Sequence, residues 1–269
     1  MSRRVLRIQY KFLVVLLKSL VASRIDYYVG TLSLLILQAS SLVFLFIAFS
    51  RRNELAGYTR DEALLFFAVA FTIQAIVQCT CEGLWLLGPK YVVQGDLDHV
   101  LTRPVPPLLL ITMAHLHGSG LIHALFGAGL IAHTLNRVAP EASLASWGLI
   151  VYAVIAGSLI QFSLILAISS LSFLHGKVIS LLAILQTLQQ FLSYPLDIFP
   201  RLVVLVLTFV VPIAYTSYYP VLSLIRLSSD PSPVILAFIV ELTGVTILCL
   251  AVSWSTWRWG LSHYQSASG

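Results

Sequence analysis

The apolar residues of this chain come in runs of about twenty, the length of helix that crosses roughly 30 Å of hydrocarbon. Six runs lie at about 29–49, 63–87, 108–130, 147–173, 178–192 and 234–254. Hydrophobic residues make up 58% of the sequence and charged residues only 10%, whereas about a quarter of a soluble protein is charged. Because backbone polar groups in lipid must bond within their own helix, we expect an all-α integral membrane protein with six transmembrane helices.

Residues 1–26 carry six of the sixteen Lys and Arg residues. Arg4, Arg7, Lys11 and Lys18 fall within one arc of a helical wheel, with leucines and Phe12 around or opposite them. We expect an amphipathic helix that lies in the membrane surface, followed by a transmembrane domain over 27–269. Anionic lipid headgroups therefore account for the net charge of +5, and no nucleic-acid partner is needed.

The interval from Gly88 to Pro107 is polar, although it lies between two long apolar runs. In so hydrophobic a chain, such an interval must lie in water or against another protein. We expect a short helix, because an aspartate can cap its start and the prolines after Arg103 would end it. The competing interpretation is a solvated turn without a partner. The candidate contact residues are Gly95, Asp96, Asp98, His99 and Arg103.

Prolines divide the apolar sequence from 194 to 233 into short pieces. The longest piece, Leu202 to Val211, is about half the length of a span. We expect a re-entrant helical hairpin, marked by Tyr194, Pro195, Pro212 and Pro220. The alternative is a full crossing by 202–225, which would move the C-terminus to the other side of the membrane.

Six spans place both termini on one side. With that side in the cytoplasm, ten of the sixteen Lys and Arg residues lie inside, as the positive-inside rule favours. Without the N-terminal helix the count is four inside against six outside. We expect a plasma-membrane protein of the bacterial inner membrane with cytoplasmic termini, anchored after its last span by Trp257, Arg258 and Trp259.

Few residues could carry chemistry. The sequence has neither a Gly-x-x-x-x-Gly-Lys-[Ser/Thr] loop for ATP phosphates nor a His-Glu-x-x-His motif, so we expect no catalytic residue and no metal. His115 and His117 point to different faces of a helix, which is poor for metal ligation. A carboxylate inside a span is costly unless it is paired or wet. Glu82 could face a translocation path, brace the N-terminal helix or reach water, and we expect Glu241 to pair within the bundle.

Three stretches carry a family resemblance. Gly95-Asp96-Leu97-Asp98, with Leu101, Arg103-Pro104 and Pro107-Leu108 after it, resembles the sequence between the second and third spans of ABC-2-type permeases. These permeases are the membrane subunits of ATP-binding-cassette exporters. The region from Tyr194-Pro195 through Pro212 to Tyr219-Pro220 is similar to the region before the last span in one branch of those permeases. The ending Tyr264-Gln265-Ser266-Ala267-Ser268 also resembles that branch.

The resemblance implies six helices with an interfacial N-terminal helix, a cytoplasmic coupling helix at 88–107 and re-entrant helices at 194–233. It also implies two copies of an ABC ATPase subunit and a second permease, either the same or a homologous chain. ATP and Mg would bind to the ATPase, and this chain would hold no cofactor. Such an assembly would export a hydrophobic or amphiphilic solute. The alternative is a stand-alone secondary transporter or channel, which internal inverted repeats and an ionisable pathway would favour.

Overall fold

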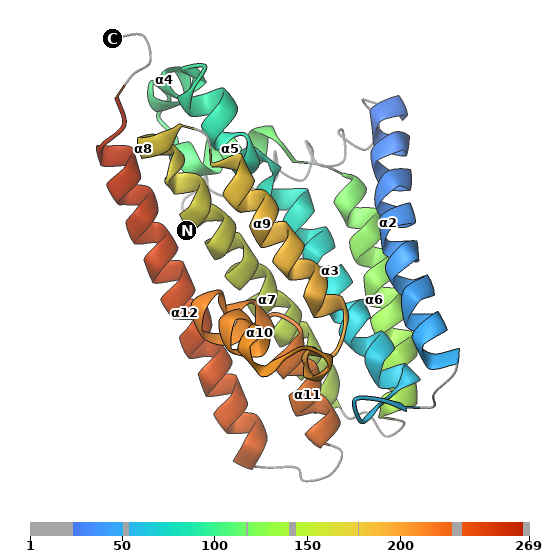
Figure 1. Cartoon of the computed structure of the whole chain (residues 1–269). Coiled ribbons are helices and arrows are strands. Elements are labelled where there is room, and N and C mark those ends of the chain that lie inside the picture. The colour runs from blue at the N-terminus through green and yellow to red at the C-terminus, as the bar shows by residue number, and fades with distance from the viewer. Residues whose placement is uncertain are drawn as a thin grey trace.

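The computed structural model describes residues 24–50, 54–116, 118–139, 144–176, 178–227 and 233–265. Within these residues the secondary structure is helical, apart from one short hairpin of strands β1 (Glu54–Leu55) and β2 (Tyr58–Thr59). Figure 1 shows the long helices side by side, with short helices at both ends of the molecule. The helices are α2 (Arg24–Ser50), α3 (Arg60–Trp85), α4 (Asp96–Leu101), α5 (Pro107–Ala114), α6 (Ser119–Val138), α7 (Leu144–Ser170), α8 (Ser172–His175), α9 (Ile179–Gln190), α10 (Arg201–Leu205), α11 (Tyr218–Leu227) and α12 (Pro233–Ser262).

Three helical runs among the described residues are long and apolar enough to cross a membrane: Arg60–Val92, Leu144–His175 and Leu236–Ser262. Gln38–Ser50, Ile179–Ser193 and Arg201–Val210 are shorter apolar helices. The expectation of an all-helical membrane protein is therefore confirmed.

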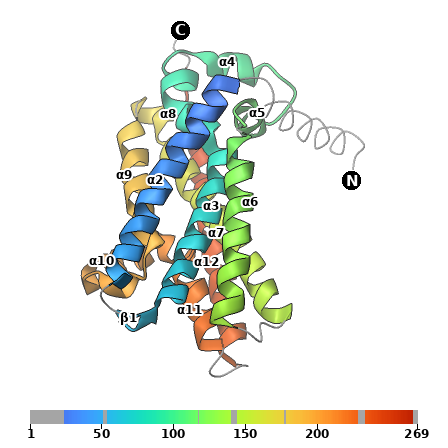
Figure 2. The same ribbon diagram turned by 90° about the vertical axis from the view of Figure 1, so that its right-hand side faces the viewer.

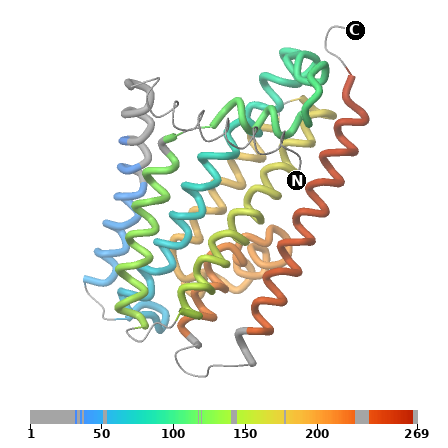
Figure 3. The backbone as a smooth tube through the Cα atoms, turned by 180° about the vertical axis from the view of Figure 1, so that it is seen from behind, coloured from blue at the N-terminus to red at the C-terminus, as the bar shows by residue number. Residues whose placement is uncertain are grey.

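Helix α3 lies at the centre of the molecule. It runs between α6 and α7, with α12 on the far side of α7 (Figure 3). In the most apolar stretch of the run that contains α3, 78% of the residues are buried, whereas in the corresponding stretch of α12 only 28% are buried. Large hydrophobic side chains such as Leu236 and Val252 point outward from α12, as expected for a helix that faces lipid.

Glycines let α6 approach α3 closely. A Cβ atom at Gly120 would lie 2.7 Å from the carbonyl oxygen of Ala75, and one at Gly127 would overlap the hydroxyl of Thr72. Gly129, on the same helix, faces open space. Small residues at helix contacts are typical of membrane proteins, where close packing drives helix association.

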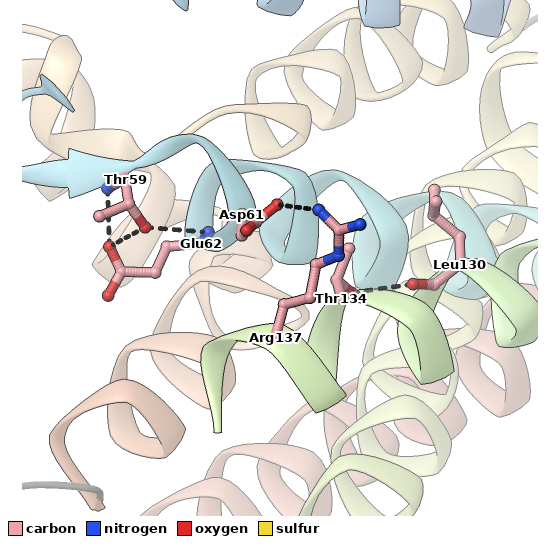
Figure 4. A network of polar contacts seen from close by, with 6 residues as sticks. All are labelled: Thr59, Asp61, Glu62, Leu130, Thr134 and Arg137. Atoms are coloured by element: carbon pink, nitrogen blue, oxygen red, sulfur yellow. Dashed lines mark hydrogen bonds and ion pairs between the residues drawn. The ribbon is translucent and has the colours of Figure 1, made fainter. Parts of the chain in front are cut away.

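Helix α3 begins at Arg60, three residues before the expected start at Ala63, because its first turn is capped. The Thr59 hydroxyl accepts a hydrogen bond from the Glu62 amide, and the Thr59 amide donates to the Glu62 carboxylate at 2.7 Å (Figure 4). This capping box gives hydrogen-bond acceptors to two backbone amides at the start of the helix. In the same view Asp61 forms an ion pair with Arg137 of α6, and the Thr134 hydroxyl donates to the Leu130 carbonyl.

The apolar run at 108–130 is not one continuous helix. Helix α5 ends at Ala114 and α6 begins at Ser119. His115 adopts a non-helical backbone conformation, and its ring bonds the Tyr91 hydroxyl at 3.0 Å. The sequence from His115 to Gly120 is also rich in poor helix formers. The prediction of a single third helix is therefore wrong for this part of the chain.

The segment from 194 to 227 does not run the length of the bundle. Helix α9 leads from the end of the molecule near α8 towards the other end, and α12 begins at that other end (Figures 1 and 2). Between them, α10 continues into a π-helical turn at Val206–Val210, and a 3-10 turn at Pro212–Tyr215 leads to α11. The prolines break this segment into short helical pieces, as the sequence predicts.

The last helix is longer than expected. It continues to Ser262, eight residues beyond the predicted end at Trp254. A Cβ atom at Gly260 would lie 2.6 Å from the Phe173 ring, so α12 passes close to α8 here. Trp257 is 3% exposed and packs edge-on against Phe173. The prediction that Trp257 anchors the membrane interface is therefore wrong, although Trp259 is exposed.

Candidate functional site

The interval from Gly88 to Pro107 begins as a continuation of α3, because a π-helical turn at Leu87–Val92 extends the helix. Gly95 then adopts a left-handed conformation with φ +81°, and α4 follows directly. Glycine takes up such a conformation without steric cost. The aspartates therefore do not cap the helix as expected. Asp96 and Asp98 lie in its first turn instead, where their negative charges interact favourably with the positive end of the helix dipole.

Helix α4 is held by one buried side chain and offers polar groups around it. Leu97 is fully buried, whereas His99 and Arg103 are exposed. Asp98 is half-buried. The chain leaves the helix through Pro104 and Pro106 into α5. The structure thus places the five predicted contact residues together, on a short helix and its flanks at one end of the molecule (Figure 1).

The base of this segment is packed tightly. A Cβ atom at Gly88 would lie 2.5 Å from the carbonyl oxygen of Gly176, so the π-helical turn rests against the end of α8. Tyr91 is buried and bonds His115. The segment around α4 is therefore tied to both α5 and α8. The basic residues Arg4, Arg7, Lys11 and Lys18, like His117, lie outside the described residues.

A cavity of about 360 Å³ lies between α3, α7 and α9. Gln74, Gln78 and Glu82 line it from α3, at intervals of four residues that place them on one helix face. Gln186 and Gln189 face them from α9. Its apolar wall includes Trp85 and Ile165. Gln78 and Gln186 are exposed, so the cavity opens at the surface of the chain.

The polar face of α3 extends beyond the cavity. The side-chain Nε2 of Gln38 in α2 donates a hydrogen bond to the side-chain Oε1 of Gln74 at 3.0 Å. His123 of α6 is buried, with its ring edge-on to Phe71. No group of three or more His, Cys, Asp and Glu side chains that could hold a metal occurs in the described ranges.

Glu241 of α12 accepts a hydrogen bond from the Tyr215 hydroxyl at 2.5 Å. Tyr215 belongs to the 3-10 turn that precedes α11, so this bond joins the 194–233 region to the last helix. Pro212 opens that turn, and Pro220 lies in the first turn of α11. Tyr194 lies against α2, with its ring edge-on to Phe44. Pro195 precedes a 3-10 turn at Leu196–Ile198.

Asp197 is the polar centre of that region. Its Oδ2 accepts hydrogen bonds from the hydroxyls of Tyr58 at 2.6 Å and Tyr218 at 2.7 Å. The Tyr218 hydroxyl is the donor in its bond, because an ionised carboxylate only accepts. Phe66 stacks on Tyr218 and meets Tyr58 edge-on. The Asp197 carboxylate thus joins the hairpin to α11, and Phe66 of α3 packs against both tyrosine rings.

Sequence reasoning missed the glutamines of the cavity and the role of Asp197. The spacing of Gln74, Gln78 and Glu82 by four residues within an apolar run is a signal that could have identified the polar face of α3. Nothing in the sequence indicates that Gln186 and Gln189 lie opposite them, because they are more than a hundred residues away along the chain.

The fold defines the class: an all-helical membrane protein with several apolar helices that could cross a membrane. The chain belongs to the ABC-2 family, because a family model described as ABC-2 family transporter protein matches residues 35–268. The resemblance found in the sequence is therefore confirmed. No curated protein and no solved structure matches the chain. Membership implies a transporter complex, and members of this membrane family are typically permeases without catalytic activity.

Proposed function

We propose that this chain is the membrane-spanning permease subunit of an ABC exporter. It pairs with a second permease, either another copy or a homologous chain, and moves a hydrophobic or amphiphilic solute outward. Two copies of a separate ABC ATPase bind ATP and Mg²⁺ and drive the cycle. The observation that carries this proposal is the family match over residues 35–268.

The proposed topology has six spans: α2, α3, the broken pair α5 and α6, α7, α9 and α12. The end of the molecule with α4 and α8 faces the cytoplasm of a bacterial inner membrane, together with both termini. The hairpin and α11 face outward. Lys90, Arg103 and Arg258 lie on the segments of the cytoplasmic end, and the excess of Lys and Arg that the positive-inside rule favours on that side comes from residues 1–26. Residues 194–233 enter the membrane from outside and return, which agrees with their short helices and with α9 leading towards the end of the molecule at which α12 begins.

The segment around α4 is the proposed receiver for motion of the ATPase. A short helix can transmit a push only if its base is rigid, and the contacts of Gly88 with α8 and of Tyr91 with His115 supply that rigidity. Asp98 and Arg103 supply charges for the contact with the ATPase. The cavity between α3, α7 and α9, with Glu82 in its wall, is the proposed part of the translocation path.

The test is purification of the tagged chain with its interaction partners in a mild detergent, followed by reconstitution into liposomes. We expect an ABC ATPase to co-purify, vanadate-sensitive ATP hydrolysis by the complex, and none by the chain alone. Transport by the reconstituted chain without an ATPase would contradict the proposal and support a secondary transporter or channel.

A further inference from the structure

The cavity between α3, α7 and α9 is large enough for a ligand. Its volume of about 360 Å³ falls within the range of about 300–1,000 Å³ that small-molecule sites occupy. It exceeds many times the share of about 30 Å³ that one water takes in the liquid. Polar and apolar walls meet in it, so a bound molecule would need both kinds of surface.

The charge of the lining selects against anions. Glu82 carries the only carboxyl group among the lining residues, and no Lys or Arg is among them. A carboxylate repels an anion strongly where water is scarce, because the effective dielectric constant is low. A sulfate, phosphate or carboxylate headgroup therefore does not fit this wall.

The carboxamides favour a headgroup with hydrogen-bond acceptors. Gln74, Gln78, Gln186 and Gln189 each carry an amide that donates two hydrogen bonds and a carbonyl that accepts two. The Nε2 atom of Gln189 is buried and has no hydrogen-bond partner among the described residues. A buried donor left unsatisfied is costly. An ammonium group offers no acceptor, whereas a hydroxyl or amide offers both an acceptor and a donor.

Part of the lining fits an apolar body. Val77 and Trp85 of α3 and Ile165 of α7 line the cavity beside the polar residues, so an aliphatic or aromatic group can lie against them while its polar end faces the glutamines.

We propose that this cavity binds an uncharged amphiphile whose headgroup carries hydroxyl or amide groups, held by the glutamines of α3 and α9. That this amphiphile is the transported solute rests on the function proposed above. The binding itself belongs to this chain and does not require the ATPase.

Three probes share the same ten-carbon tail and differ only in their headgroup: decyl maltoside, decyl sulfate and decyltrimethylammonium. Binding of each tritiated probe is measured by scintillation proximity on the full chain in nanodiscs, with empty nanodiscs as background. We expect decyl maltoside to bind about tenfold more tightly than either charged probe. The sulfate would be repelled by the Glu82 carboxylate, and the ammonium group would leave the carboxamide N–H groups without an acceptor.

The variants Gln78→Leu and Gln189→Leu should each weaken binding of decyl maltoside by about fivefold to tenfold. Gln190→Leu is the matched control, because Gln190 is an exposed glutamine on the same helix that does not line the cavity. It should bind like the unchanged chain. If a leucine variant fails to fold, as judged by gel filtration, the order of the three probes on the unchanged chain still decides the matter.

Tighter binding of decyl sulfate would overturn the proposal. So would tighter binding of decyltrimethylammonium that Glu82→Gln abolishes, because that result describes a cation site. ATP hydrolysis by the assembled complex is measured separately. A complex that hydrolyses ATP while the chain prefers a charged probe contradicts only this inference, whereas selective binding without any ATPase association contradicts the function proposed above.

Discussion

Asp197 joins two parts of the chain that lie far apart in the sequence, the hairpin and the 194–233 region. Tyr58 comes from the hairpin and Tyr218 from α11, and both donate to the same carboxylate oxygen. Both tyrosines are less than a tenth exposed. Hydrogen bonds to a charged group contribute about 1.5–3 kcal/mol, and a buried group that loses its partner is costly. This single carboxylate therefore holds the 194–233 region against the hairpin that precedes α3.

Replacing Tyr218→Phe should lower the stability of the chain by about 1.5–3 kcal/mol, since it removes one of two bonds to the carboxylate. Tyr152→Phe is the control: the Tyr152 hydroxyl bonds the Thr243 hydroxyl at an exposed, neutral site, and its loss should cost about 0.5–1 kcal/mol. The midpoint of thermal unfolding in detergent measures both. Equal shifts in the two variants would show that Asp197 has no special role.

Gly120 and Gly129 lie on the same helix and differ in what surrounds them. The Cβ atom of Gly120→Ala would meet both the backbone and the Cβ of α3 residues, so α6 must move away and stability should fall by about 1–3 kcal/mol. Gly129→Ala meets open space and should be neutral or slightly stabilising, because alanine favours the helix. Thermal unfolding of the pair tests this, and a larger loss in Gly129→Ala would contradict the arrangement of α3 and α6.

At the scale of elements, the sequence predicted some features better than others. The short helix at Asp96–Leu101 and the proline-broken region before α12 follow from local residue types, and both are present. The break between α5 and α6 falls in a local stretch of poor helix formers, whereas the bond between Tyr91 and His115 beside it spans 24 residues and no local pattern reveals it. The cavity was missed for the same reason, because its two polar walls come from α3 and α9.

Helix α4 also supports a prediction of its own. Asp98→Lys or Arg103→Glu should reduce the ATP hydrolysis of the assembled complex at least fivefold, since reversal of a contact charge costs about 1 kcal/mol or more at an interface. Glu54→Lys is the control, because Glu54 is an exposed residue of β1, at the other end of the molecule. Unchanged hydrolysis in both α4 variants, with the complex intact, would favour the interpretation of this segment as a solvated turn.

At the scale of the whole molecule, the long helices run between two ends that carry different short elements. Helices α4 and α8 lie at one end, and the hairpin and α11 lie at the other (Figure 2). Helix α3 fills the middle, and its polar face meets α2 and α9. A path along that polar face would lead from one end towards the other. Which end faces the cytoplasm then decides whether α4 can meet a cytoplasmic ATPase.

Single cysteines can decide the orientation. With Cys79, Cys81 and Cys249 replaced by alanine, Glu54→Cys should react with a membrane-impermeant maleimide on intact cells, because Glu54 is exposed on the hairpin that is proposed to face outward. His99→Cys and His263→Cys should react only after permeabilisation. If His263→Cys instead reacts on intact cells together with Glu54→Cys, the 202–225 segment crosses the membrane and the C-terminus lies outside. If His99→Cys is the position that reacts, the whole molecule is inverted, and α4 cannot meet a cytoplasmic ATPase.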